Sequence, residues 1–213
     1  MKTKYHIEIT QNALRDWFSP EALQLIIKAN IHQDRIKNQF GHDYIHFDTS
    51  AFEEGFQYIQ DQERLIIKGV KLEDYLSSWE ALGRLTHSWQ DFYSHSNYVK
   101  LFMANSGITS PEAIQHDRLD ILNHPDLRSG KNYGVIEYLA LLPGIGKLVT
   151  PLMPDDSHAR MNLDSPASSP LFGYVYWAAF KRTQNAIETI LLKLIENHIN
   201  QDKISNFMIK IVR

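Results

Sequence analysis

Apolar residues recur with the period of an α-helix along most of this 213-residue chain. The first helical face, at i, i+3, i+4, i+7, i+8 and i+11, is made by His6, Ile9, Thr10, Ala13, Leu14 and Trp17. Ser19 followed by Pro20 is typical of the start of a second helix, which we expect to run to about Ala29. No stretch of useful length alternates as a strand does. The sequence therefore predicts an all-α fold, a single-domain helical bundle over residues 1–213.

The remaining helices are expected at less regular intervals. Ser50 with Glu53 three residues later forms a capping-box pattern that predicts a helix start. The helical pattern breaks between residues 32 and 49, which indicates a loop. Residues 123–170 are rich in Pro, Gly, Ser, Asn and Asp, so we expect mostly irregular chain there. Helices are predicted at about residues 72–103, 111–122, 134–142 and 171–198, and a short tail follows.

Composition excludes several kinds of site. The chain has no cysteine, so it forms neither disulfides nor thiolate metal sites. A net charge of -3 and an isoelectric point near 6.4 lack the basic character typical of proteins that bind duplex nucleic acid. The apolar stretch Val135–Met153 is interrupted by Glu137, Lys147 and two prolines, and no signal-peptide core follows Met1. We therefore expect a cytoplasmic protein without a membrane-spanning helix.

The most informative motif is His87-x3-Asp91-x3-His95. Residues four apart on a helix lie one turn above each other, so an imidazole and a carboxylate face a common point. Both are zinc ligands when no thiolate is present. The alternative is a solvent-exposed polar stripe that includes Glu80 and Arg84. A buried helix is favoured by the surrounding aromatic residues, which are Trp79, Trp89, Phe92, Tyr93 and Tyr98.

The segment from Leu82 to Asn97, with Leu-Gly and then H-x3-D-F-x2-H-S-N, resembles the signature helix of HET-C-related proteins. Those proteins resemble the superfamily of zinc-dependent phospholipase C and single-strand nucleases, which are all-α and hold a cluster of zinc ions. The resemblance implies that His6, Asp34 and His46 are also zinc ligands. Without the resemblance, His6 on an apolar helix face would be interpreted as a core residue. Asp43 and Asp48 are alternative candidates for the ligand position of Asp34.

The resemblance also implies one more His and carboxylate pair beside His95. His158 with Asp164, in H-x3-N-x-D-S-P, is favoured over His116 with Asp120. The segment that contains His116 and Asp120 can also be interpreted as an exposed helix surface. Secreted members of that superfamily hold one ion through an N-terminal tryptophan, which this sequence lacks. We therefore expect two or three Zn²⁺ ions, held by His6, Asp34, His46, His87, Asp91, His95, His158 and Asp164.

From this resemblance we expect a zinc-dependent phosphoesterase, most simply a phospholipase C-like hydrolase in which zinc-bound hydroxide attacks a phosphodiester. Asp91 would bridge two ions, Asp34 could accept a proton, and His95, His158 and Asp164 would hold the most exchangeable ion. The expected substrate is a phosphate ester, with phospholipid preferred. The segment Tyr133–Met153 is interpreted either as a lid that contacts a membrane surface or as buried core.

Three other functions stay open at this stage. A nuclease or nucleotidase could use the same zinc core, with Tyr44, Phe47 and Trp89 as stacking platforms. An HD-type phosphohydrolase would use His42-Asp43 and His116-Asp117, although the first pair lies in an expected loop. A HET-C-like interaction protein would keep zinc for structure, with sites closed by four protein ligands. The sequence does not determine the oligomeric state.

Overall fold

The computed structural model describes residues 1–213 except 36–37, 39–40, 142–143 and 210–213. Among the described residues helices and isolated bridges are the regular structure, with no strand, so the predicted all-α bundle is confirmed. Two helices begin the chain, α1 (Thr3–Leu14) and α2 (Pro20–Ile31). The buried residues of α1 include the predicted face from His6 to Leu14. Helix α2 begins as expected, with Ser19 accepting a hydrogen bond from the Ala22 amide.

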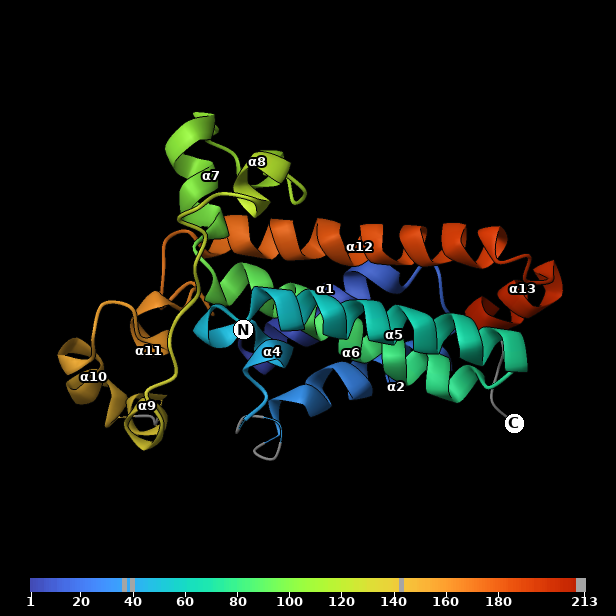
Figure 1. Ribbon diagram of the computed structural model, residues 1–213, viewed down its shortest axis with the longest axis horizontal. Helices are drawn as coiled ribbons and strands as arrows, with labels where there is room; N and C mark the ends of the chain where they lie inside the picture. The colour runs from blue at the N-terminus through green and yellow to red at the C-terminus, as the bar shows by residue number, and fades with distance from the viewer. Residues whose placement is uncertain (36–37, 39–40, 142–143, 210–213) are drawn as a thin grey trace.

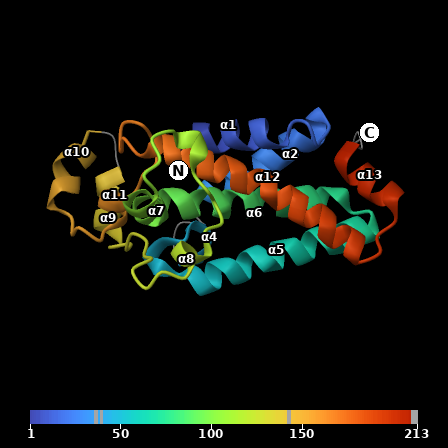
Figure 2. The same ribbon diagram turned by 90° about the horizontal axis from the view of Figure 1, so that it is seen from above.

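The long helices α5 (Phe52–Leu72), α6 (Tyr75–His95) and α12 (Phe172–Glu196) run side by side along the molecule (Figures 1 and 2). Helix α6 lies at the centre, in contact with α2, α5 and α12. Gly83 permits the close approach to α2, because a Cβ at this position would lie 2.3 Å from the Ile26 carbonyl oxygen. The centre of α6 therefore faces protein on every side.

Short elements gather at one end of the bundle. The segment before α5 contains η1 (His32–Asp34), α4 (Asp43–His46) and η2 (Asp48–Ser50). After α6 come α7 (Tyr98–Ser106), η3 (Pro111–Ala113) and α8 (Leu119–Leu122). The irregular region contains α9 (Val135–Leu141), α10 (Gly146–Val149), η4 (Thr150–Leu152) and α11 (His158–Met161). Figure 1 shows α9, α10 and α11 together at the end near Met1.

Several predicted boundaries were wrong. The expected helix over 72–103 is two helices, because the chain turns at Ser96 and Asn97 to bond with residues 128–129. Only 111–113 and 119–122 of the expected 111–122 helix are helical. Ser50 does not cap α5, since its hydroxyl accepts from the Ser129 amide. A further helix, α13 (Gln201–Ile209), replaces the expected tail.

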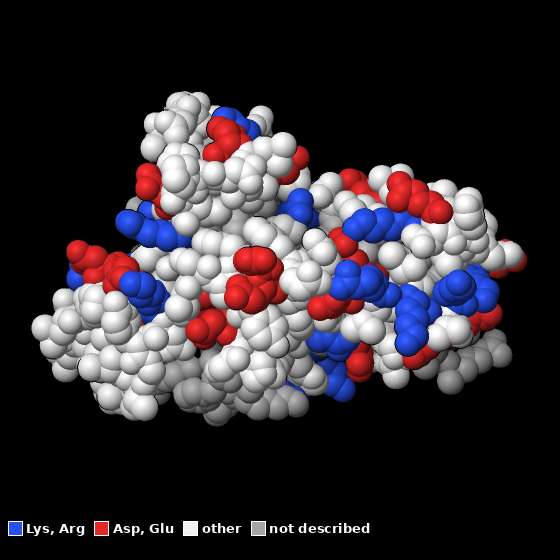
Figure 3. All heavy atoms as spheres, in the orientation of Figure 1, with Lys and Arg blue, Asp and Glu red and all other residues white. Residues whose placement is uncertain are grey.

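The apolar segment after Tyr133 is not a buried core segment. Val135, Leu148 and Leu152 are 75%, 76% and 85% exposed. In the view of Figure 3 the end that carries α9 and α10 shows few charged side chains, whereas charges of both signs cover the end with α5 and α13. No helix in the described part of the chain is long and apolar enough to cross a membrane. Contact of this segment with a membrane surface stays a prediction.

Candidate metal centre

Helix α6 presents the three residues of the central motif to the interior. His87 and Asp91 are fully buried and His95 is 5% exposed, so the alternative of a solvent-facing polar stripe is wrong. The helical repeat places His87 Nε2 2.9 Å from Asp91 Oδ2. Asp91 has both of its oxygens in contact with polar groups, and the two oxygens face different sets of side chains.

The first set lies on the Oδ2 side of Asp91. His46, at the end of α4, places Nδ1 2.8 Å from Asp91 Oδ2 and 3.2 Å from His87 Nε2. Asp34, in η1, places Oδ1 3.7 Å from His87 Nε2. Ligand atoms about 2.0–2.1 Å from a tetrahedral ion lie about 3.3 Å from one another, which is close to the distances among the His46, His87 and Asp91 atoms. Ligand atoms of Asp34 lie within 4.8 Å of those of His6, His87 and Asp91.

The second set lies on the Oδ1 side of Asp91. The α-amino group of Met1 lies 2.6 Å from Oδ1 and 3.1 Å from Asp164 Oδ1. His6 Nε2 is 3.2 Å from Asp91 Oδ1, and His95 Nε2 is 3.7 Å from it. His6 and His87 are stacked, with ring centroids 4.4 Å apart. The predicted bridging position of Asp91 is thus consistent with its surroundings, and binding of two ions by it stays a prediction.

A buried amide network holds His6 in place. Gln90 Oε1 lies 2.6 Å from His6 Nδ1, so Nδ1 carries the proton and donates it to the amide. The Gln90 amino group donates to the hydroxyls of Thr10 and Thr183. Asn30 donates to Gln90 Oε1 from the opposite side. The His6 Nε2 lone pair therefore faces Asp91, as a metal ligand would. The hydrogen bond from Nδ1 to Gln90 fixes the ring orientation, as such bonds do for metal-binding histidines.

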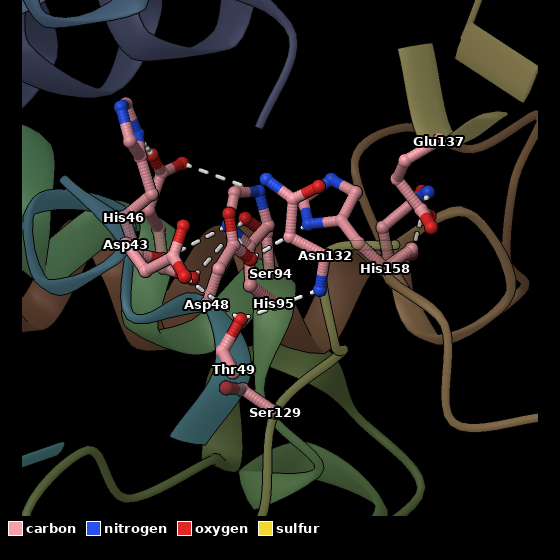
Figure 4. Close-up of polar contacts among 12 residues, drawn as sticks. Asp43, His46, Asp48, Thr49, Ser94, His95, Ser129, Asn132, Glu137 and His158 are labelled. Carbon is pink, nitrogen blue, oxygen red and sulfur yellow. Dashed lines mark hydrogen bonds and ion pairs between the residues drawn. The ribbon is translucent and has the colours of Figure 1, made fainter. Parts of the chain in front are cut away.

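A second cluster gathers around Asp48, in the close-up of Figure 4. His158 donates from Nδ1 to Asp48 Oδ1 at 2.6 Å. His95 Nδ1 donates to the His46 carbonyl at 2.9 Å and lies 3.3 Å from the same Asp48 oxygen. The His95 and His158 rings meet edge to face, with centroids 4.4 Å apart. Ligand atoms of Asp48, His95 and His158 all lie within 4.8 Å of one another. These three residues have the donor types and spacing of a further metal site.

Asp164 and His158 both lie beside His95, and a second carboxylate, that of Asp48, lies there as well. Asp164 Oδ1 lies 3.4 Å from His95 Nε2, on the side of Met1, whereas His158 contacts Asp48 at the Nδ1 side of His95. His95 therefore stands between two carboxylates. Asp48, which the sequence offered only as a competitor of Asp34, is the carboxylate beside His158. Binding of one ion by His158 and Asp164 together stays a prediction.

A loop in an unusual backbone conformation supplies Asp48. Phe47, Thr49 and Ser50 all have positive φ, at 56°, 56° and 57°, and this region is costly for a β-branched residue such as Thr49. The Thr49 amide donates to the Gly130 carbonyl, and the Ser50 amide to the Ser129 hydroxyl. No helical period marks such a position. Only the local crowding of acidic residues around His46 could have indicated Asp48.

Charge compensation within the centre shifts several pKa values. Burial alone would raise the pKa of Asp91, but Met1, His95 and His87 lower it well below its usual value. Burial alone would likewise raise the pKa of Asp48, but His158 and His95 lower it below its usual value. Burial lowers the pKa of His87 to about 4, against the influence of Asp91. His87 is therefore neutral near pH 7, which is the form that binds a metal ion.

Two other groups carry positive charge. Burial and the Met1 amine would lower the pKa of His95, but Asp91 and Asp48 raise it well above its usual value. Burial would also lower the pKa of the Met1 amine, but Asp164 and Asp91 raise it to about 11. Without a metal ion, the buried carboxylates are thus neutralised by protons that an ion would have to displace.

The donor set fits zinc. Imidazole nitrogens and carboxylate oxygens, with no sulfur, are ligands that zinc accepts. Four buried polar atoms of the centre lack a hydrogen-bond partner within the described part of the chain, as ligand atoms would in the absence of their ion. They are His6 Nε2, His46 Nε2, His87 Nδ1 and Asp164 Oδ1. The other ring nitrogens of His46 and His87 face Asp91, so the atoms without a partner point away from it. Asp164 Oδ1 lies 3.1 Å from the Met1 amine, so only His6 Nε2 carries this part of the argument.

The alternative site residues lie elsewhere. Asp120 is exposed and forms an ion pair with Arg118 at 2.6 Å, and His116 belongs to neither cluster of potential ligands in the described residues. Asp43 accepts a hydrogen bond from Thr49, so it is not part of a second metal site either. Phe47 and Trp89 are buried among aromatic rings and are not stacking platforms. Tyr44 is half-buried and lines a cavity.

Comparisons with known proteins place the chain in a different family from the one that its motif suggested. A sequence model of the VWA7 N-terminal domain matches residues 6–117, just over half of the chain. The von Willebrand factor A domain-containing protein 7 of Rattus norvegicus and that of Homo sapiens are each 31% identical to it over 80 residues. Those residues are 38% of this chain and 9% of either relative. No solved structure matches the chain.

The fold and the buried cluster define an all-α domain with a His and Asp centre. This chain belongs to the VWA7 N-terminal domain family. The inferred membership of the phospholipase C and nuclease superfamily is therefore wrong, as are the hydrolase, phospholipase C-like and HET-C-like assignments that came from it. The resemblance rested chiefly on the segment from Leu82 to Asn97, where His and Asp recur at the four-residue spacing that places polar residues on one buried helix face, and such spacing does not define a superfamily.

Proposed function

We propose that this chain is a zinc-binding domain. The observation that carries the proposal is the buried triangle of His46 Nδ1, His87 Nε2 and Asp91 Oδ2, whose sides are 2.8, 2.9 and 3.2 Å. A carboxylate oxygen and two imidazole nitrogens at these separations, in a buried position, match the distances between the ligand atoms of a tetrahedral zinc ion. Asp34 Oδ1, 3.7 Å from His87 Nε2, would be the fourth ligand.

The second ion would be held by the cluster of Asp48, His95 and His158. Three protein ligands leave one tetrahedral position for water or another ligand, whereas Asp34, His46, His87 and Asp91 supply four. The first position is thus suited to a structural ion, and the second to an exchangeable one. The Oδ1 side of Asp91, with His6 and Asp164, offers further donors, so a total of two or three ions stays a prediction.

A bound zinc ion supplies Lewis acidity and activates water near neutral pH. The chain's own residues would orient the ions and hold protons: Asp34 is the ligand of the first group with an exposed side chain, at 27%. Its role as proton acceptor, and hydrolysis of a phosphate ester at the centre, stay predictions that rest on this chemistry alone. No phospholipid or other specific substrate follows from the family.

The proposal is tested by the metal content of purified protein. We expect about two or more zinc ions per chain after reconstitution and dialysis, measured by elemental analysis. Less than about half an equivalent would overturn the proposal. Alongside, zinc-loaded protein is assayed on a generic phosphodiester, phosphatidylcholine vesicles and single-stranded DNA. Turnover that a chelator abolishes would support a phosphoesterase, whereas bound zinc with no turnover would indicate a structural role.

A further inference from the structure

A cavity of about 490 Å³ lies beside the centre, and its described lining residues come from α2, α5, α6 and the short elements η1 and α4 with their neighbours. Its size is that of a small-molecule site. Gln33 and Ile45 line it, and they are the neighbours of Asp34 and His46 in the chain. The same two short elements therefore form the cavity wall and supply ligands to the centre.

The cavity has a positive charge excess in a chain whose net charge is -3. Three basic side chains line it, those of Lys28, Arg35 and Arg84, against one carboxylate, that of Glu80. Glu80 lies 3.8 Å from Arg84, at the outer limit of an ion pair. Within the described residues, no carboxylate lies within 4.0 Å of the Lys28 amine or the Arg35 guanidinium, although Arg35 contacts His32 at 3.0 Å. The cavity thus attracts anions.

Arg84 is held in place at the wall. Its Nε donates to Gln62 Oε1 at 2.7 Å, and the side chain is 28% exposed. The guanidinium has five N–H donors, of which this bond uses one. Apart from the 3.8 Å approach of Glu80 to Nη1, no partner of the terminal amino groups lies among the described residues. A planar pair of N–H donors matches the oxygens of phosphate.

Aromatic rings also line the cavity. The rings of Tyr44 and Tyr58 meet edge to face, with centroids 5.5 Å apart. The ring centroids of His42 and Tyr44 are 5.9 Å apart. The Tyr58 hydroxyl donates to Gln33 Oε1 at 3.2 Å. Beyond these tyrosines, a second depression is lined by Glu53, Glu54 and Asp61. The tyrosines therefore separate a basic cavity from an acidic surface that repels anions.

We propose that this cavity binds a small molecule that carries a phosphate group, with Arg84 and Lys28 contacting the phosphate and Tyr44 contacting the uncharged part. The proposal does not depend on zinc, because the lining residues are not ligands of the centre. It is tested on metal-free protein, kept with a chelator, so that a failure of this proposal is distinguishable from a failure of the zinc proposal.

Binding is measured by isothermal titration calorimetry with phenyl phosphate, glycerol phosphate and inorganic phosphate. We expect phenyl phosphate to bind more tightly than the other two, since only it offers a ring to the tyrosines. Arg84→Gln and Lys28→Gln should each weaken binding of all three probes by roughly tenfold, the worth of one charge-assisted contact. Lys28 is exposed and without a partner in the described chain, so its replacement preserves the fold.

Arg15→Gln is the matched control. Arg15 is exposed at the end of α1 and does not line the cavity, so its replacement removes the same charge and should leave binding unchanged. Tyr44→Ala should weaken phenyl phosphate and leave inorganic phosphate unchanged. No binding of any probe at millimolar concentration, or the same loss in Arg15→Gln as in Lys28→Gln, would overturn the proposal. Equal affinities for phenyl and inorganic phosphate would overturn the role of Tyr44.

Discussion

The two parts of the centre differ in how the chain supports them. The helical group, His6, Asp34, His46, His87 and Asp91, is built mainly on α1 and α6, and its members except Asp34 are buried. The loop group, Asp48, His95 and His158, draws one residue from the end of α6 and two from short or strained segments. A rigid bundle supports the first group, whereas a few loop contacts hold the second together.

The difference has a physical cause. Helix α6 fixes His87 and Asp91 one turn apart, and the Gln90 network orients His6 from within the same bundle. Asp48 depends instead on the left-handed residues Phe47 and Thr49, and its partner His158 begins the four-residue helix α11. We therefore expect the loop group to lose its ion under changes that the helical group survives.

The largest expected effect comes from the residue that the two sides of the helical group share. Asp91→Asn removes the negative charge of the carboxylate that contacts His46, His87, His6 and the Met1 amine. Even indirect supports of a metal ligand cost about 10–100-fold in affinity, so loss of a direct ligand should cost at least that. Zinc bound per chain, measured by elemental analysis after dialysis, should fall to less than half of the native amount.

Asp120→Asn is the control for that substitution, because it is the same chemical change at an exposed carboxylate paired with Arg118. It should leave the zinc content unchanged. Equal zinc content in the two variants would contradict the position of Asp91 at the heart of the centre, and would leave only the loop group as a metal site.

Two glycines allow the bundle and the loop to be disturbed separately. A Cβ at Gly130 would lie 2.5 Å from the Cα of His158, and one at Gly83 would lie 2.3 Å from the Ile26 carbonyl oxygen. Overpacking against backbone costs about 1–3 kcal/mol. Gly83→Ala should lower the melting temperature of the metal-free chain more than Gly130→Ala does, because it pushes α2 away from α6.

Gly130→Ala should instead show its effect in metal binding. The displaced α11 takes His158 away from Asp48, so we expect one ion fewer than in the native chain and an unchanged content at the helical group. Calorimetric titration with zinc measures both the number of ions and their affinities. A native zinc content in this variant would mean that the loop group binds no ion, or that α11 moves without harm.

The helical period predicted most of the architecture and the common face of His87, Asp91 and His95, whereas Asp34 and His46 came only from the family resemblance and Asp48 followed from neither. His87, Asp91 and His95 recur at four-residue spacing, so their common face follows from helix geometry alone. Asp48 has no such spacing, because its position is set by residues 129–130, far along the chain. Contacts of this kind depend on tertiary structure, and no local pattern encodes them.

The same limit explains the wrong boundaries. Ser50 and Glu53 have the capping-box spacing, but the Ser50 hydroxyl is used by Ser129, and Ala51 stands at the cap of α5. The 111–122 pattern has a helical start signal, but Tyr93 and Tyr98 donate to the carbonyls of His116 and Gln115, and these residues are not helical. In both places a long-range hydrogen bond outweighs a local preference.

A smaller effect distinguishes Asp48 from Asp164 as the carboxylate of the loop group. Asp48→Asn should abolish binding of the most exchangeable ion, because His158 Nδ1 and His95 Nδ1 both face Asp48 Oδ1. Asp164→Asn is the matched change on the other side of His95, and it should leave that ion in place. Zinc release to a colorimetric chelator gives the fast-exchanging fraction in each variant. The opposite result, with the fraction lost only in Asp164→Asn, would restore the pairing that the sequence suggested.

The smallest effect expected is the response of the metal-free chain to pH, and it should differ between the two groups. Burial lowers the pKa of His87 to about 4, below the 6.5 expected in the unfolded chain. The unfolded state therefore binds more protons between these pH values, and His87 makes the folded chain lose stability, on the order of 3 kcal/mol, as pH falls from 6.5 to 4. The raised pKa of His95 has the opposite sign, because its contribution is fully present below pH 6.5 and is lost as pH rises through the folded value.

Free energies of unfolding measured in urea at pH 6.5 and 4.5, with a chelator present, test this difference. The native chain should lose stability across this interval, and His87→Asn should lose less, because the substitution removes the buried group that resists protonation. His158→Asn is the control on the loop side and should retain the native slope, since it keeps His87. Identical slopes in the native chain and His87→Asn would show that His87 titrates normally, and would remove the argument that the helical group is held ready, in its neutral form, for a metal ion.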